Sequence, residues 1–119
     1  MNDWEKTLIS PDAPILEAIR IIDTGAMQIA LVVDENRRLL GTLTDGDIRR
    51  EILKGVAMQD PVRQIMNPNP TTAAESVTRS DLLQKLRETD LHQFPIVDDA
   101  GLVVGLETVD EILKPPNQD

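Results

Sequence analysis

The chain opens with a pattern of apolar positions that predicts a short series of alternating strands and helices. Ile15, Ala18, Ile19 and Ile22 recur at helical spacing, and Gly25 follows them as a typical C-terminal stop. The run 29–33 is apolar at every position and too short for a helix, so it predicts a strand buried on both faces.

The elements around this helix and strand follow from the same kind of pattern. Residues 7–9 form a short apolar piece, and the serine, aspartate and prolines of 10–14 predict a capped helix start. A charged turn at 34–38 joins the buried strand to a second strand at 39–44. A second helix is predicted from residue 46 to about residue 54, ending near Gly55.

The whole block is then repeated 64 positions later without a gap. This offset takes Gly41 to Gly105, Thr44 to Thr108 and Ile48 to Ile112. The second copy predicts a strand at 71–73, a helix with apolar Val77, Leu82, Leu83 and Leu86, strands at 94–97 and from Leu102, and a helix ending at Lys114. We expect repeat 1 at 1–60, a packed linker at 61–70, repeat 2 at 71–114 and an unfolded tail or the start of a linker at 115–119.

Length and composition limit the classes of function. At 119 residues the chain suits one compact domain, or two half-domains that would each be marginal alone and should share a core. A net charge of -9 with no cluster of Lys and Arg argues against nucleic acid as a partner. The chain has no cysteine, no apolar signal core at its start, and no run near the ~18 residues of a membrane span, so a cytoplasmic protein is expected.

The junction at 41–48 carries the first candidate chemistry. A strand ends there and a helix begins, and the unpaired N–H groups of a helix start can receive a phosphate. The Asp47 carboxylate can accept two hydrogen bonds from a ribose diol, and the Thr44 hydroxyl can reach ribose or phosphate. The same spacing also describes a capping box, which would stabilise the helix by ~1 kcal/mol without a ligand.

These residues also carry a family resemblance. Gly41-Thr42-Leu43-Thr44-Asp45-Gly46-Asp47 resembles the hallmark of CBS domains, except that Thr42 stands at a hydrophobic place. Phe94-Pro95-Ile96-Val97-Asp98 resembles the proline-containing strand of the same family. Two such units in register, covering residues 7–114, are similar to a CBS pair, or Bateman module.

The resemblance implies a mixed α/β (α+β) fold in which each repeat runs strand, helix, strand, strand, helix. The two small sheets would pack with pseudo-twofold symmetry and leave two clefts that hold AMP, ADP, ATP or S-adenosylmethionine. Such modules regulate an attached domain and commonly form homodimers. The sequence of residues 28–50 is moreover similar to that of CBS pairs that precede sugar-phosphate nucleotidyltransferase domains.

The expected nucleotide site combines the junction residues with apolar walls. Trp4 and Phe94 are the only aromatic residues, so adenine would rest on aliphatic side chains such as Ile9, Ile29 and Leu31. His92 stands close to where family members place phosphate-contacting side chains, although a surface histidine is the simpler interpretation. The full set of predicted binding residues is Thr7, Ile9, Ile29, Ala30, Leu31, Thr44, Asp47, His92, Phe94, Thr108 and Glu111.

Repeat 2 departs from the pattern at its acidic positions. Glu111 stands where repeat 1 has Asp47, and Glu107 stands where repeat 1 has Leu43. A longer side chain misplaces the acceptor oxygens, and an added carboxylate disfavours a phosphate. Arg49 and Arg50 could neutralise a phosphate near the first junction, but charged residues on a second helix are usually a solvated face.

Catalysis has little support in the sequence. One histidine and no cysteine leave no nucleophile and base pair, so no catalytic residue is assigned. No metal site is assigned either, because the spacing around Asp45 and Asp47 is not that of a calcium loop, and Mg²⁺ would arrive with ATP. Two alternatives stay open, a structural dimerisation module without a ligand and a small nucleotide-processing enzyme.

Overall fold

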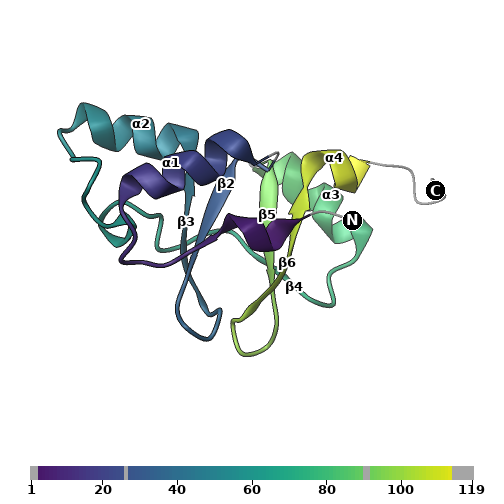
Figure 1. The fold of residues 1–119 in the computed structure, drawn as a ribbon. Coiled ribbons are helices and arrows are strands. Elements are labelled where there is room, and N and C mark those ends of the chain that lie inside the picture. The colour runs from purple at the N-terminus through teal and green to yellow at the C-terminus, as the bar shows by residue number, and fades with distance from the viewer. Residues whose placement is uncertain (1–2, 26, 90–91, 114–119) are drawn as a thin grey trace. The chain divides into compact units, whose positions relative to one another are not determined.

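The computed structural model describes residues 3–25, 27–89 and 92–113. The chain divides into two compact units, unit 1 at Met1–Pro70 and unit 2 at Thr71–Asp119. Unit 1 contains, in order, η1 (Trp4–Thr7), β1 (Leu8–Ile9), α1 (Ile15–Thr24), β2 (Ile29–Val33), β3 (Leu39–Thr44), α2 (Asp45–Leu53) and η2 (Val62–Gln64). Unit 2 contains β4 (Ala73–Ala74), α3 (Arg79–Glu88), β5 (Gln93–Val97), β6 (Val103–Thr108) and α4 (Val109–Leu113) (Figure 1).

Each unit has a three-stranded sheet with the same topology. The strand orders are β1-β2-β3 and β4-β5-β6, with the first pair parallel and the second antiparallel. Ile29 pairs with Thr44 in unit 1, and Gln93 pairs with Thr108 at the corresponding place in unit 2. Even the irregularity between Val32 and Val33 recurs between Ile96 and Val97. The mixed α/β fold with two small sheets, which the family resemblance implies, is confirmed.

Helices α1 and α2 contact each other and pack on the sheet of unit 1 (Figure 1). All five residues of β2 are buried, as the apolar run predicts. The core of this unit consists of Ile9, Ile15, Ala18, Ile22, Ala30, Val32, Leu43, Ile48 and Val62. The core of unit 2 is smaller and contains Ala73, Leu82, Phe94, Ile96 and Ile112.

The start of α1 differs from the sequence-based prediction. The expected capping side chain is absent, because Pro14 occupies the N-cap position and no side chain bonds the first turn. The N–H groups of Ile15 and Leu16 instead donate to the carbonyls of Asp60 and Met58, at 2.9 and 3.1 Å. Backbone from far along the chain therefore closes this helix end.

The first helix of unit 2 also begins later than predicted. Val77 lies before α3 rather than on it, although it still packs against the unit 2 core. The helix begins after Thr78, whose hydroxyl caps it. The final helix is described as far as Leu113, so Lys114 and the predicted tail at 115–119 lie outside the described residues.

Segment 55–70, of which 61–70 was predicted to be a packed linker, belongs to unit 1. Val62 is fully buried in the unit 1 core. Thr42 and Asn67 form an isolated antiparallel bridge, with N–H···O distances of 3.1 and 2.9 Å. Because β3 lies at the edge of its sheet, this bridge covers part of an otherwise unpaired strand edge.

Candidate functional site

The junction between β3 and α2 folds into a complete capping box. The Asp47 backbone N–H donates to Thr44 Oγ1 at 3.4 Å, and Asp47 Oδ2 accepts the backbone N–H of Thr44 at 3.0 Å. The Thr44 hydroxyl also donates to Asp47 Oδ2, at 3.0 Å. Both side chains are part-buried, so the box both stabilises the helix start and fixes the orientation of the carboxylate.

A cation completes the surroundings of this carboxylate. Arg50 donates to Asp47 Oδ1 at 3.3 Å from the next turn of α2. Arg49 points to a different partner and pairs with the Asp45 carboxylate at 2.7 Å. In the sequence, both arginines are candidates for neutralising a phosphate. The structure shows each of them bound within its own helix.

The apolar residues predicted to hold adenine do not all share one surface. Ile9 and Ala30 belong to the core that faces the helices of unit 1. Neighbouring residues of a strand point to opposite faces, so Ile29 and Leu31 lie on the other face of β2. All four are buried. Thr7 is buried as well, and its hydroxyl donates to the carbonyl of Trp4.

The predicted residues of unit 2 are also divided. Phe94 is fully buried in the core, next to Leu82 and Ile112. His92 is exposed, and its backbone carbonyl accepts the N–H of Val109 at 2.8 Å at the start of α4. His92 therefore contributes a backbone bond to the second junction.

The second junction repeats one of the bonds of the first. The Glu111 N–H donates to Thr108 Oγ1 at 3.4 Å, as Asp47 does to Thr44. Glu107 lies directly across from Phe94 on the neighbouring strand and is only partly exposed. Burial, and secondly the charge of Glu111, raise the pKa of Glu107. Negative charge is therefore concentrated beside the α4 helix start.

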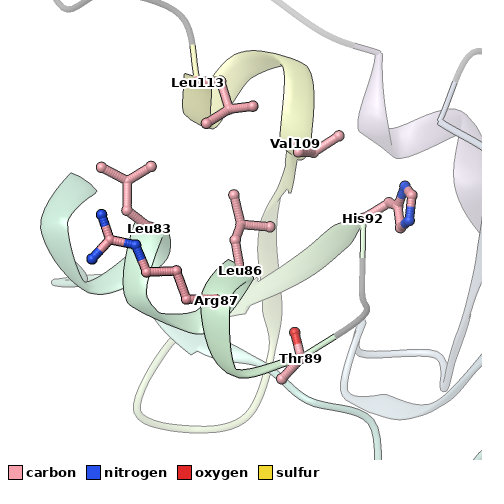
Figure 2. Close-up of a pocket in the computed structure, with 7 residues that line it drawn as sticks. All are labelled: Leu83, Leu86, Arg87, Thr89, His92, Val109 and Leu113. Carbon is pink, nitrogen blue, oxygen red and sulfur yellow. The ribbon is translucent and has the colours of Figure 1, made fainter.

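One cavity adjoins the second junction, and another lies at the ends of two strands of unit 1. One, of about 500 Å³, opens between α3 and α4 and is lined by Leu83, Leu86, Arg87, Thr89, His92, Val109 and Leu113 (Figure 2). The other, of about 410 Å³, adjoins the ends of β1 and β2 and is lined by Leu8, Ile9, Ser10, Pro11, Asp12, Val33, Asp34 and Glu35. His92 is the only predicted binding residue in the first lining and Ile9 the only one in the second.

Metal binding and membrane insertion find no support in the described part of the chain. Residues 3–25, 27–89 and 92–113 contain no group of three or more His, Asp or Glu side chains placed to hold a metal ion. Within the same ranges, none of the helices has the length and apolar character required to cross a bilayer.

The duplicated junctions, the two matching sheets and the helix order find their counterpart in a known family. The sequence matches the CBS domain twice, over residues 6–54 and 62–115. The chain belongs to the CBS domain family. It therefore carries a tandem pair of CBS domains, and this part of the resemblance seen in the sequence is confirmed.

Relatives of this CBS pair occur in larger proteins. Inosine-5'-monophosphate dehydrogenase of Aquifex aeolicus is 34% identical over 107 residues, which cover 89% of this chain and 21% of the relative. Arabinose 5-phosphate isomerase GutQ of Salmonella typhimurium is 29% identical over 91 residues, which cover 76% of this chain and 28% of the relative. The chain thus spans 21% and 28% of the length of these two relatives.

Solved structures show the same fold. The cytosolic domain of the Mg²⁺ channel MgtE, in complex with ATP, is similar with a TM-score of 0.75 and 25% identity, covering 89% of this chain and 43% of that one. CBSX2 in complex with AMP is similar with a TM-score of 0.77 and 23% identity, covering 89% and 83%.

Proposed function

We propose that this CBS pair is a regulatory module that binds an adenosine nucleotide, AMP, ADP or ATP, or a related adenosyl ligand. The observation that carries the proposal is the β3–α2 junction, where a helix start, a fixed carboxylate and a hydroxyl meet. Such a group offers acceptors to a ribose diol and N–H groups to a phosphate. Similarity to domains solved with ATP and with AMP supports the choice of ligand.

A thermal-shift screen tests the proposal directly. AMP, ADP, ATP and S-adenosylmethionine would each be added to the intact chain, with guanosine nucleotides as the control for the base. A ligand at 100 times its Kd should stabilise the protein by ~2.7 kcal/mol. Mg²⁺ should matter only for ATP, because the metal is expected to arrive with the nucleotide. If none of the adenosyl ligands changes the melting temperature, the module is structural and not a sensor.

The regulated partner would be a catalytic domain in the same polypeptide. A sugar-phosphate nucleotidyltransferase domain is our candidate. Its support is the similarity of residues 28–50 to CBS pairs that precede such domains. The relatives named above place similar pairs in a dehydrogenase and an isomerase. Measuring nucleotidyl transfer by a longer chain, with and without AMP, would decide the identity of the partner and the sign of the regulation.

Two further properties belong to the same proposal. We expect a homodimer, because α2 and α4 each end in an exposed leucine, with Leu53 83% and Leu113 58% exposed. We also expect the predicted cytoplasmic location, where adenosine nucleotides are present to be sensed.

The module itself should do no chemistry. Nucleotide recovered unchanged after incubation would distinguish it from a small nucleotide-processing enzyme.

A further inference from the structure

The turn between β2 and β3 places an arginine in a conformation that favours glycine. In this turn the Asp34 carboxylate accepts the N–H groups of Asn36 and Arg38, both at 2.9 Å. Arg37 has a φ of 68°, in the left-handed region that L side chains rarely adopt. The turn of unit 2 has the same bonds around Asp98, and there the left-handed residue is Gly101, with a φ of 84°.

The Arg37 side chain has two partners in the N-terminal segment. Its guanidinium lies 2.9 Å from the Glu5 carboxylate and 5.8 Å from the centre of the Trp4 ring. These are an ion pair and a cation–π contact, and both are made by the 3₁₀ helix η1. Arg37 therefore attaches η1 to the hairpin of unit 1.

The attachment leads directly to residues of the predicted nucleotide site. The carbonyl of Trp4 accepts the hydroxyl of the buried Thr7. Thr7 is followed at once by β1, where Ile9 pairs with Val32 of β2. Since β1 has only two residues, its own ladder fixes it weakly, and η1 supplies additional contacts with α1 and β2.

The positions of the second copy that correspond to this attachment carry other residues. Pro68 and Asn69 stand 64 positions after Trp4 and Glu5, and Gly101 has no side chain to reach them. The arginine is thus specific to the unit whose junction keeps the Thr44 and Asp47 pair.

We propose that Arg37 is a positioning residue for the nucleotide site of unit 1, which holds Thr7 and β1 in place through Trp4 and Glu5. This inference rests on the proposed nucleotide-binding function. Its physical basis is that a binding surface prepared before the ligand arrives does not have to be ordered at the moment of binding. Releasing η1 should therefore weaken nucleotide binding without a matching loss of fold stability.

The test compares Arg37→Gly with the unaltered chain. Glycine keeps the turn, as Gly101 does in unit 2, and removes both contacts to η1. We expect ATP or AMP binding, measured by calorimetry, to weaken about three- to tenfold, the range for losing a part-exposed cation–π contact and ion pair. Trp4 is the only tryptophan, so acrylamide quenching of its fluorescence should increase and report the release of η1.

Two further variants separate positioning from charge. Arg38→Ala removes the neighbouring exposed arginine and the same unit of charge, and it should bind nucleotide as the unaltered chain does. Arg37→Lys keeps a cation for Glu5 and should restore part of the affinity. The melting temperature of Arg37→Gly should stay close to that of the unaltered chain, because relief of the left-handed arginine offsets the lost contacts.

The outcomes are distinct. If Arg37→Gly releases Trp4 but binds nucleotide with unchanged affinity, the positioning role is refuted while the proposed function stands. If Arg38→Ala weakens binding as much as Arg37→Gly, the effect is one of charge, and positioning is likewise refuted. If the unaltered chain binds none of the adenosyl ligands, the proposed function fails first and the positioning role with it.

Discussion

At the residue scale, Asp47 has an observed capping role and a proposed ligand-binding role, and a simple substitution would mix the two. Its carboxylate accepts three hydrogen bonds within unit 1, two from Thr44 and one from Arg50. A carboxylate offers about four acceptor positions, so with the capping box and the Arg50 pair intact one remains for a ligand, and not the two that the sequence suggested for a ribose diol. Stability and ligand binding therefore have to be measured separately at this residue.

Asp81 provides the matched control for Asp47. It forms a capping box with Thr78 at the start of α3, and it is not among the predicted binding residues. Asp47→Ala should weaken nucleotide binding about 10- to 150-fold if its charged hydrogen bonds are worth ~1.5 to 3 kcal/mol. Asp81→Ala should lose only the capping energy, ~1 kcal/mol, with no change in affinity.

Glu111→Ala tests whether the two junctions differ. We expect it to affect binding far less than Asp47→Ala, since Glu111 is longer and lies near Glu107. Calorimetry on all three variants gives the comparison. A loss of affinity confined to Glu111→Ala would mean that the second junction is the binding one, and equal losses for Asp47 and Asp81 would leave capping as the whole explanation.

Glu107 makes the stability of unit 2 depend on pH. Burial and the charge of Glu111 raise its pKa above the ordinary 4.5, so the folded state holds the proton more tightly than the unfolded state. The ionised carboxylate therefore destabilises the fold above the raised pKa, and this cost disappears as the pH falls to below 4.5. Glu107→Gln should stabilise the protein at neutral pH and lose this advantage on acidification.

Urea unfolding at several pH values checks this prediction. Asp99→Asn removes an exposed carboxylate of the same unit and controls for the change in net charge. A gain from Glu107→Gln that is the same at all pH values would show that the side-chain replacement, and not the ionisation, is responsible.

At the element scale, two equivalent glycines differ in what surrounds them. A Cβ at Gly41 in β3 would lie 2.7 Å from the Asn67 carbonyl oxygen and 2.7 Å from the Met66 sulfur. At Gly105 in β6, the nearest atom would be Ile96 Cβ at 3.6 Å, an ordinary contact. The Asn67 backbone cannot withdraw without breaking its bridge to Thr42.

We therefore expect Gly41→Ala to destabilise the protein by about 1–3 kcal/mol, the usual cost of overpacking. Gly105→Ala should stay within about 0.5 kcal/mol of the unaltered chain. Denaturant unfolding of the two variants measures both values. Equal costs would show that the glycines serve strand geometry alone and that the crossing segment is irrelevant.

The elements themselves could be predicted because the relevant signals are local or duplicated. The offset of 64 residues places α3 on α1 to the residue, and the apolar run 29–33 is a buried strand as expected. The capping box of Thr44 and Asp47 follows from spacing alone. Contacts between distant segments could not be predicted in this way, because no periodicity encodes them. The closing of α1 by residues 58–60 and the Arg37–Trp4 contact are of this kind.

The candidate site was predictable in part for the same reason. Which side chains form a helix start is a local property, whereas the division of Ile9 and Leu31 between opposite faces of the sheet depends on strand register. The left-handed backbone of Arg37 also lacked a signal, since an arginine at that position does not indicate it as a glycine would.

At the scale of the whole molecule, self-association is the property with the clearest readout. The exposed leucines at the ends of α2 and α4, and the apolar part of the cavity between α3 and α4, offer surface that a partner copy would cover. Light scattering should show a dimer at micromolar concentration. Leu53→Lys should shift the chain toward monomer, while Lys54→Ala, which removes only an exposed ion pair, should not. A strictly monomeric unaltered chain at high micromolar concentration would contradict the prediction.

The attachment of segment 58–67 to unit 1 bears on the order of events during synthesis. The N-terminal end of α1 forms hydrogen bonds with the carbonyls of Met58 and Asp60, which are synthesised later. The edge of β3 likewise pairs with Asn67. A nascent chain that has just completed α2 therefore still exposes a helix end and a strand edge. We expect both to be closed once about fifteen more residues have emerged, before the first strand of unit 2 leaves the ribosome. The interval in which unit 1 could pair with a neighbouring nascent chain is thus limited to the translation of that short segment.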